Sequence, residues 1–218
     1  LLFFGYFLVA LKIYILVAYL PFFILFLILK NVNLIKNPLA KALLVLGFFI
    51  GSIFGFVRIS SSIKGALSSY ASKGIVQGIK NYQVNYENQA AYVESNFSLG
   101  VDFDGSPASL VKIAPAAVIA TLFRPFIWES KKVSTLLSSL ESLALMIFTL
   151  YVFKKVGIIK FLRTIIKNPI ILYCFFYSLL FALFVGATTL NFGTLVRYKI
   201  PGIPFYIISL FLILDFNN

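Results

Sequence analysis

Two short stretches in the second half of the sequence combine cations with aromatic residues. LFRPFIWES contains Arg124, and NFGTLVRYKIP contains Arg197 and Lys199. A guanidinium group is a planar fork that suits a phosphate, and an ammonium group is a compact point charge. If these side chains converge at one rim of a helical bundle, they form a pocket for a lipid-linked diphosphate, with Asn191 and Tyr198 adding hydrogen bonds. The alternative is contact with lipid headgroups, which requires no special geometry.

Two glutamates are the candidate catalytic groups. Glu141 lies in the middle of the apolar run VSTLLSSLESLALMIF, where a carboxylate costs roughly 2.5–3.5 kcal/mol to insert. We therefore expect it to face protein or water and to pair with Arg124 or Arg197, either as a general base or as a polar contact between helices. Glu129 follows Trp128 in a Pro-containing turn. This turn predicts either a structural ion pair with Arg124 beside an aromatic anchor, or a site for an anion or a sugar.

Residue types that hold metals and cofactors are scarce in this sequence. It has no His and a single Cys, Cys174, which excludes an internal disulfide, a Cys-based zinc or iron–sulfur site and a His-ligated haem. The stretch DFDGS at 102–106 is similar to the start of a calcium loop, but Ile113 stands where such a loop needs Glu. We therefore predict no metal and no cofactor, and interpret this stretch as a turn.

The composition is typical of a membrane protein. Hydrophobic residues make up 61% of the sequence and charged residues 12%, against roughly 25% charged residues in soluble domains. Apolar runs that approach the roughly 20 residues needed to cross the hydrocarbon layer occur at 13–29, 42–57, 133–153, 169–190 and 200–214. The predicted fold class is therefore all-α, a polytopic transmembrane bundle of about five spanning helices. The chain opens on LLFFGYFLVA without a charged leader, so we expect it to begin inside a membrane segment.

The distribution of charge predicts the orientation of these segments. Residues 30–41 and 154–167 carry eight of the 19 cations and no acid, which indicates the cytoplasmic face and contact with anionic membrane lipids. The net charge of +12 therefore needs no nucleic-acid partner. The predicted units are N-terminal membrane helices at 1–57, an extracytoplasmic segment at 58–132 and C-terminal membrane helices at 133–218. Residues 108–123 are expected to form an amphipathic or re-entrant surface helix that Pro115 interrupts.

The series LFRPFIWES, SSLESL and NFGTLVRYKIPGIPFY resembles the C-terminal half of multi-spanning bacterial inner-membrane proteins from surface-polysaccharide gene clusters. The shared features are a turn of the F-x-P-F-x-W-E type, a helix with an acidic residue and a last loop of the N-x-G-T-x-x-R-Y-x-x-P type, within residues 90–210. The resemblance implies a polymerase, ligase or glycosyltransferase that handles polyprenyl-linked sugars. The residues that these motifs carry over are Arg124, Trp128, Glu129, Glu141, Asn191, Arg197 and Tyr198.

Two functions from different classes follow. In the first, an integral protein of the bacterial inner membrane acts on a polyprenyl diphosphate-linked glycan, as a membrane glycosyltransferase or polysaccharide polymerase, and cations at the outer face stabilise the departing diphosphate. In the second, the chain is a non-catalytic membrane subunit of a larger complex, and Gly47, Gly51 and Gly55 provide a face for close helix contact. The first function makes the protein an enzyme and the second does not, and the sequence leaves both open. A transporter, which needs broken helices in two matching halves, ranks last.

Overall fold

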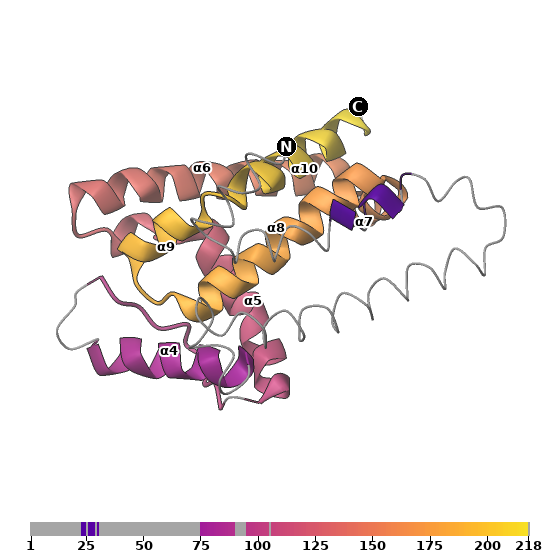
Figure 1. Cartoon of the computed structure of the whole chain (residues 1–218). Helices are drawn as coiled ribbons and strands as arrows, with labels where there is room; N and C mark the ends of the chain where they lie inside the picture. Colours follow the sequence, from indigo (N-terminus) through magenta and orange to yellow (C-terminus); the bar gives the residue numbers. More distant parts are fainter. Residues whose placement is uncertain are drawn as a thin grey trace, which may run out of the picture.

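The computed structural model describes residues 23–24, 26–28, 30, 75–89, 95–104 and 106–217, and the structural statements below concern this part of the chain. Its elements, shown in Figure 1, are α4 (Ile75–Gln89), α5 (Pro107–Phe123), the 3-10 helix η2 (Ile127–Glu129), α6 (Val133–Val156), α7 (Ile158–Lys167), α8 (Pro169–Thr188), α9 (Phe192–Lys199) and α10 (Ile203–Asp215). The described residues form no strand, which confirms the predicted all-helical class. Most of the predicted run at 13–29 and all of the run at 42–57, with its glycines, lie outside the described residues.

Two of the described helices are long and apolar enough to cross a membrane. These are α6, with 24 residues, and α8, with 20 residues, and they correspond to the predicted runs at 133–153 and 169–190. The pair α9 and α10 meets the same test only as one span bent by 58°. The described residues therefore contain two candidate spans, or three if the bent pair is one span, and do not support the expected count of about five.

The helix α5 lies directly against α8 rather than on a free surface (Figure 1). Gly186 of α8 permits this contact, because a Cβ atom there would lie 2.2 Å from the carbonyl oxygen of Ala117. Thr121 Oγ1 donates a hydrogen bond across the contact to the carbonyl oxygen of Ala182 at 2.8 Å. The expected interruption at Pro115 is wrong, since α5 continues through this residue. A proline removes a single helical donor, and the packing on α8 holds the helix together.

The core between α6, α8 and α10 combines aliphatic packing with a buried polar contact. Val152, Ile171 and Leu210 have no exposed surface. Tyr206 and Thr149 place their hydroxyl oxygens 3.3 Å apart, so that one donates to the other inside the bundle. A buried hydroxyl without a partner is costly in an apolar environment, and this pairing satisfies both groups. Side chains from the three helices thereby share one core.

The helix α4 lies within the segment 58–132 and packs against α8. Its Ile79 is buried, and Gln83 Nε2 donates to the carbonyl oxygen of Ala187 at 3.1 Å. This bond satisfies one of the last carbonyl groups of α8, which lack partners within their own helix.

A capped turn starts α5 at the DFDGS stretch. Ser106 Oγ accepts from the backbone N–H of Ser109 at 3.1 Å, and Asp104 Oδ1 accepts from the backbone N–H of Ser106 at 2.7 Å. Hydrogen bonding from Ser109 and then from Ser106 lowers the pKa of Asp104 to about 2. Within the described residues no group of three or more Asp, Glu, Cys or His side chains is placed to hold a metal ion. The stretch therefore acts as a helix start.

Candidate functional site

The three stretches that carry the candidate residues meet at one end of the bundle. This end, here named the α9 end, consists of η2, the beginning of α6 and the helix α9 (Figure 1). A further stretch, 95–100, runs beside the loop between α8 and α9. The backbone N–H of Phe97 donates to the carbonyl oxygen of Leu190, and that of Phe192 to the carbonyl oxygen of Ser95, both at 2.9 Å. Residues almost a hundred positions apart are thus fixed side by side.

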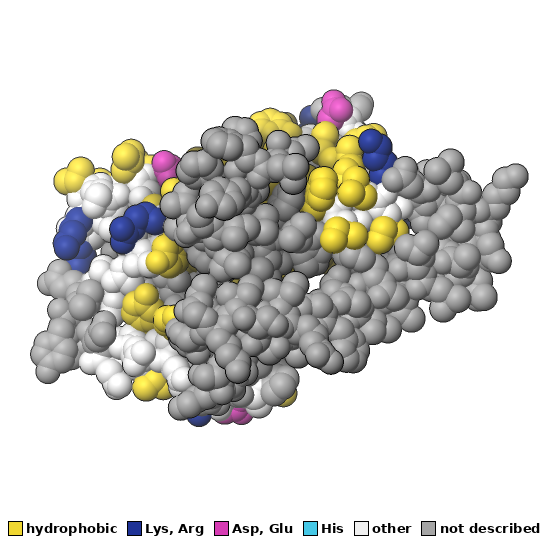
Figure 2. Space-filling view, viewed as in Figure 1, with side chains coloured by type: hydrophobic (Ala, Val, Ile, Leu, Met, Phe, Trp, Pro, Cys, Tyr) yellow, Lys and Arg dark blue, Asp and Glu magenta, His cyan; other side chains and the backbone are white. Residues whose placement is uncertain are grey.

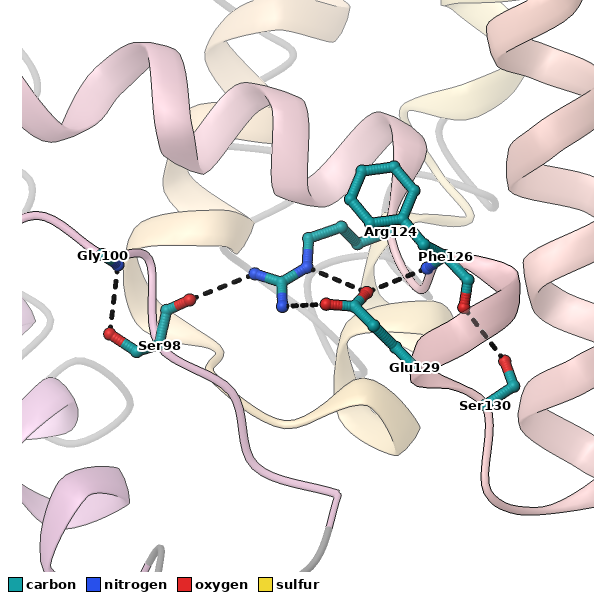
Figure 3. Close-up of polar contacts among 6 residues, drawn as sticks. All are labelled: Ser98, Gly100, Arg124, Phe126, Glu129 and Ser130. Carbon is teal, nitrogen blue, oxygen red and sulfur yellow. Dashed lines mark hydrogen bonds and ion pairs between the residues drawn. The ribbon is translucent and has the colours of Figure 1, made fainter.

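The guanidinium group of Arg124 is held on two sides at this end (Figure 3). Nε and Nη2 donate to the two carboxylate oxygens of Glu129 in a bidentate ion pair, with 3.1 Å between Nε and Oε2. Nη1 donates to the carbonyl oxygen of Ser98 at 3.1 Å. Glu129 also accepts from the backbone N–H of Phe126 at 2.9 Å, which orients the carboxylate. We name Arg124, Glu129, Ser98 and Phe126 the Arg124 clamp.

Two aromatic rings complete the surroundings of the clamp. The guanidinium carbon of Arg124 lies 4.3 Å from the ring centre of Phe97 and 5.3 Å from that of Phe192. The two rings stack on each other with their centres 4.6 Å apart. A cation over an aromatic face is attracted by the negative charge of the ring surface. Arg124 therefore links the stretch 95–100, the turn after α5 and the beginning of α9, and its charge is satisfied inside the protein.

Both polar atoms of the Asn191 side chain form hydrogen bonds within the protein. Its Nδ2 group donates to Ser95 Oγ and to Asn96 Oδ1, both at 2.7 Å. Its Oδ1 atom accepts from the backbone N–H of Thr194 at 3.2 Å, which makes Asn191 the N-cap of α9. The role predicted for this residue was a hydrogen bond to a ligand. Its observed contacts instead define where α9 begins.

Lys199 turns inward, with only 6% of its surface exposed. Its Nζ atom donates to the carbonyl oxygen of Arg124 at 3.1 Å and to Ser142 Oγ at 2.8 Å. Ser142 Oγ also donates to the Arg124 carbonyl oxygen, at 3.2 Å. We name Lys199, Ser142 and the Arg124 carbonyl group the Lys199 junction. It joins α9, α6 and the end of α5, and places the predicted cation inside the bundle instead of at a rim.

The remaining candidates lie nearer the surface. Glu141 is exposed on α6 and interacts electrostatically with Lys199, while neither arginine forms an ion pair with it among the described residues. Trp128 is 80% exposed and stacks on Phe126 with ring centres 4.8 Å apart, as suits an aromatic anchor. Tyr198 is 38% exposed. The predicted pairing of Glu141 with Arg124 or Arg197 is therefore absent among the described residues.

Three exposed cations lie on the elements of the α9 end. Arg197 is exposed, and its Nε atom donates to the carbonyl oxygen of Gly193 at 2.9 Å within its own helix. Lys131 and Lys132, between η2 and α6, are exposed as well. None of the three forms an ion pair with a described residue. Figure 2 shows Lys and Arg side chains on the surface at this end of the molecule. We name Arg197, Lys131 and Lys132 the rim cations.

The structure brings some of the predicted residues together and separates others. Arg124, Glu129 and Lys199 belong to one connected network, and the predicted ion pair between Arg124 and Glu129 is present. Arg197, in contrast, is exposed and lies outside this network. No local signal identified the aromatic rings around Arg124 or the serines that contact it, because these residues lie far from Arg124 along the chain.

These features define an all-helical protein with two to three candidate membrane spans among its described residues and a cationic, aromatic polar site at one end. Comparison of the chain with protein-family models, with curated proteins and with solved structures found no match. Its function is therefore inferred from its own fold and site.

Proposed function

We propose that this is a multi-pass protein of the bacterial inner membrane that binds a polyprenyl diphosphate-linked saccharide during surface-polysaccharide assembly. The observation that carries this proposal is the set of exposed rim cations at the α9 end, which have no ion pair within the described residues. A diphosphate presents several acceptor oxygens to Arg and Lys, and its prenyl chain can remain in the lipid beside the spans. About five spanning helices, counting the two predicted runs at 13–29 and 42–57, belong to this proposal.

The Arg124 clamp and the Lys199 junction support such a site indirectly. Arg124 is engaged by Glu129, and Lys199 is buried, so neither offers a free charge to a ligand. Together they fix the turn after α5 against α6 and α9, the elements that carry the rim cations. A binding site is effective when its supporting contacts hold the binding groups in place. In this proposal Arg197 and the two lysines bind, and the clamp positions them.

A glycosyl transfer at this site also needs a group that accepts the proton of the attacking hydroxyl. Glu129 already accepts three hydrogen bonds from Arg124 and Phe126, so its role is structural. Glu141 is exposed and accepts no hydrogen bond from a described residue, and it is the better candidate base. The acceptor oxygen would bond to the sugar carbon as the bond to the diphosphate breaks. The diphosphate would leave with the electron pair, and the cations would stabilise its charge.

Substitution of the rim cations tests this function in cells that need the protein for their surface polymer. The triple variant K131Q/K132Q/R197Q should lose most polymer while its amount in the membrane stays normal. The matched control is K112Q, which removes an exposed cation from α5, roughly 18 Å along the helix from Arg124. A normal polymer in the triple variant contradicts the proposal. Loss of polymer in the triple variant and in E141Q, but not in the control, supports a glycosyl transfer in which the rim cations bind the diphosphate and Glu141 is the base.

The second candidate function is a non-catalytic membrane subunit. It is favoured by the contacts of the Arg124 clamp. Arg124 and Glu129, both from the stretch LFRPFIWES, bind each other and the Ser98 carbonyl oxygen, so their charges serve internal structure. Purification of the native protein in mild detergent separates the two candidates. A subunit should co-migrate with partner membrane proteins, and the triple variant should leave the polymer unchanged. A protein that runs alone and requires its rim cations for polymer formation is not such a subunit.

A further inference from the structure

The helix α7 connects the ends of two candidate spans. It has ten residues and is joined to α6 and to α8 by single residues, Gly157 and Asn168. Gly157 has a φ of 78°, a backbone conformation that ends α6 and suits glycine. If α6 and α8 both cross the membrane, the short connections leave α7, which is roughly 15 Å long, at the membrane surface where the two spans end.

Three rows of side chains run along α7, and among the described residues one of these rows is buried and the other two are exposed. The inward row is buried and comprises Phe161, Thr164 and Ile165. The second row is apolar, with more than half of each residue exposed, and comprises Ile159, Leu162 and Ile166. The third row is cationic and exposed, and comprises Lys160, Arg163 and Lys167.

The two exposed rows lie next to each other. Both follow the spacing i, i+3, i+7 and are offset by one residue, so they run in parallel about 100° apart around the helix. Lys154 and Lys155 at the end of α6 add two exposed cations nearby. Asp215 of α10 is an exposed carboxylate at the same end of the bundle, where Asn217 Nδ2 donates to Thr164 Oγ1 at 3.0 Å. It forms no ion pair with the described cations, so the end stays strongly positive.

We propose that α7 is an interfacial helix that binds anionic phospholipid and holds this end of the protein in one leaflet. Its apolar row inserts between acyl chains, and its cationic row contacts the phosphates of negatively charged headgroups. A helix lying in the plane of the membrane has this division of faces, with Lys and Arg beside a large apolar surface. Figure 2 shows exposed hydrophobic side chains with a Lys or Arg side chain beside them at the end of the molecule where the C-terminus lies.

A lipid surface accounts for both exposed rows, whereas a soluble acidic partner accounts for only one. An acidic protein would contact the cations but leave three large apolar side chains in water. Each of them is exposed by 52% or more. Because hydrocarbon and phosphate occur side by side at the membrane boundary, one leaflet supplies both kinds of contact at the spacing that α7 requires. This inference does not depend on the function proposed for the α9 end.

Native mass spectrometry of the purified full chain tests the proposal, with phosphatidylglycerol and phosphatidylcholine offered in equal amounts. The wild type should retain phosphatidylglycerol preferentially, and added salt should reduce the preference. In K160Q/R163Q/K167Q the preference should fall by about fivefold for each cation removed. The matched control K160R/R163K/K167R keeps all three charges and should behave like the wild type.

Two results overturn the proposal. One is equal retention of the two lipids by the wild type at low salt, which needs no variant and is unaffected by any folding defect. The other is an undiminished preference in the glutamine variant. The reactivity of the buried thiol of Cys174 with a fluorescent reagent reports whether each variant is folded. A preference that disappears only in the glutamine variant, with the thiol still protected, supports binding by α7.

Discussion

Replacing Arg124 by Met should destabilise the protein more than it affects ligand binding directly. The substitution keeps an unbranched apolar side chain but removes three N–H donors, two to Glu129 and one to the Ser98 carbonyl oxygen. It also removes the cation from beside the ring of Phe97. The carboxylate of Glu129, whose side chain is mostly buried, would then lack its counter-charge.

The size of the effect follows from these contacts. The side chains of Arg124 and Glu129 are 17% and 18% exposed, so water screens the pair only in part. Breaking a fully buried pair costs about 3–5 kcal/mol, and partial exposure places this pair at about 2–4 kcal/mol. Glu129→Gln leaves the arginine its other contacts and should cost about 1–2 kcal/mol. The double variant should be more stable than the sum of the single effects predicts, by about 1 kcal/mol or more.

The single cysteine of the chain provides the assay. Cys174 is buried in α8, so a thiol-reactive fluorescent reagent reports its exposure as the protein unfolds on heating. With roughly 2–4 °C of melting temperature per kcal/mol for a chain of this size, R124M should melt about 4–16 °C below the wild type. The matched control is R163M, which removes an exposed arginine of α7 and should change the melting temperature little. Equal melting temperatures for R124M and the control, or strictly additive effects in the double variant, would refute the structural role of the clamp.

The remaining predictions concern the packing and the caps. Gly186→Ala should destabilise the protein by about 3 kcal/mol or more, because its Cβ would meet the Ala117 backbone at 2.2 Å. Gly193→Ala should destabilise it less in the same thermal assay, because its Cβ would meet only the side-chain oxygen of Asn191, at 3.3 Å. Lys199→Met should lower the melting temperature, since it leaves the buried acceptors of the junction without their charged donor at a cost of about 1–3 kcal/mol. Asp104→Asn should lower stability at neutral pH. Because the folded pKa of Asp104 is lowered to about 2, the difference from the wild type should be complete above the unfolded pKa and disappear as the pH falls through about 2, in melts recorded across that range.

The long helices could be predicted from the sequence because their signal is local. A run of apolar residues with cations beyond its end, such as 133–153, specifies a helix without reference to any other part of the chain. The same holds for the start of α8, where Pro169 is a local signal. The stretch NFGTLVRYKIP was expected to form a loop, and the structure instead forms the helix α9 there, with Asn191 as its cap.

The path of α5 could not be predicted in this way. Lys112 and Pro115 suggested an interrupted surface helix, and Pro115 does remove a donor. What holds the helix is the close approach of Gly186 and the hydrogen bond from Thr121, both of which depend on α8. Tertiary contacts of this kind leave no periodic pattern in α5 itself.

The candidate site also combines a feature that the local sequence predicts with features that depend on distant residues. The ion pair between Arg124 and Glu129 was predicted as one of two alternatives because the residues are five positions apart in a Pro-containing turn. The burial of the Lys199 side chain was not predicted, because it depends on Ser142 and on the carbonyl group of Arg124, which are distant along the chain. The ring of Phe97 reaches Arg124 because backbone hydrogen bonds join the stretch 95–100 to Leu190 and Phe192, and this pairing has no signal in the local sequence.

The most direct measurement of the central claim is the affinity of the purified protein for a polyprenyl diphosphate, compared with the uncharged polyprenol. The wild type should bind the diphosphate more tightly, and K131Q/K132Q/R197Q should lose about tenfold or more in Kd while keeping the melting temperature of the wild type. Equal affinity for the charged and uncharged lipids, or a Kd that the triple variant leaves unchanged, would contradict a diphosphate site at the α9 end.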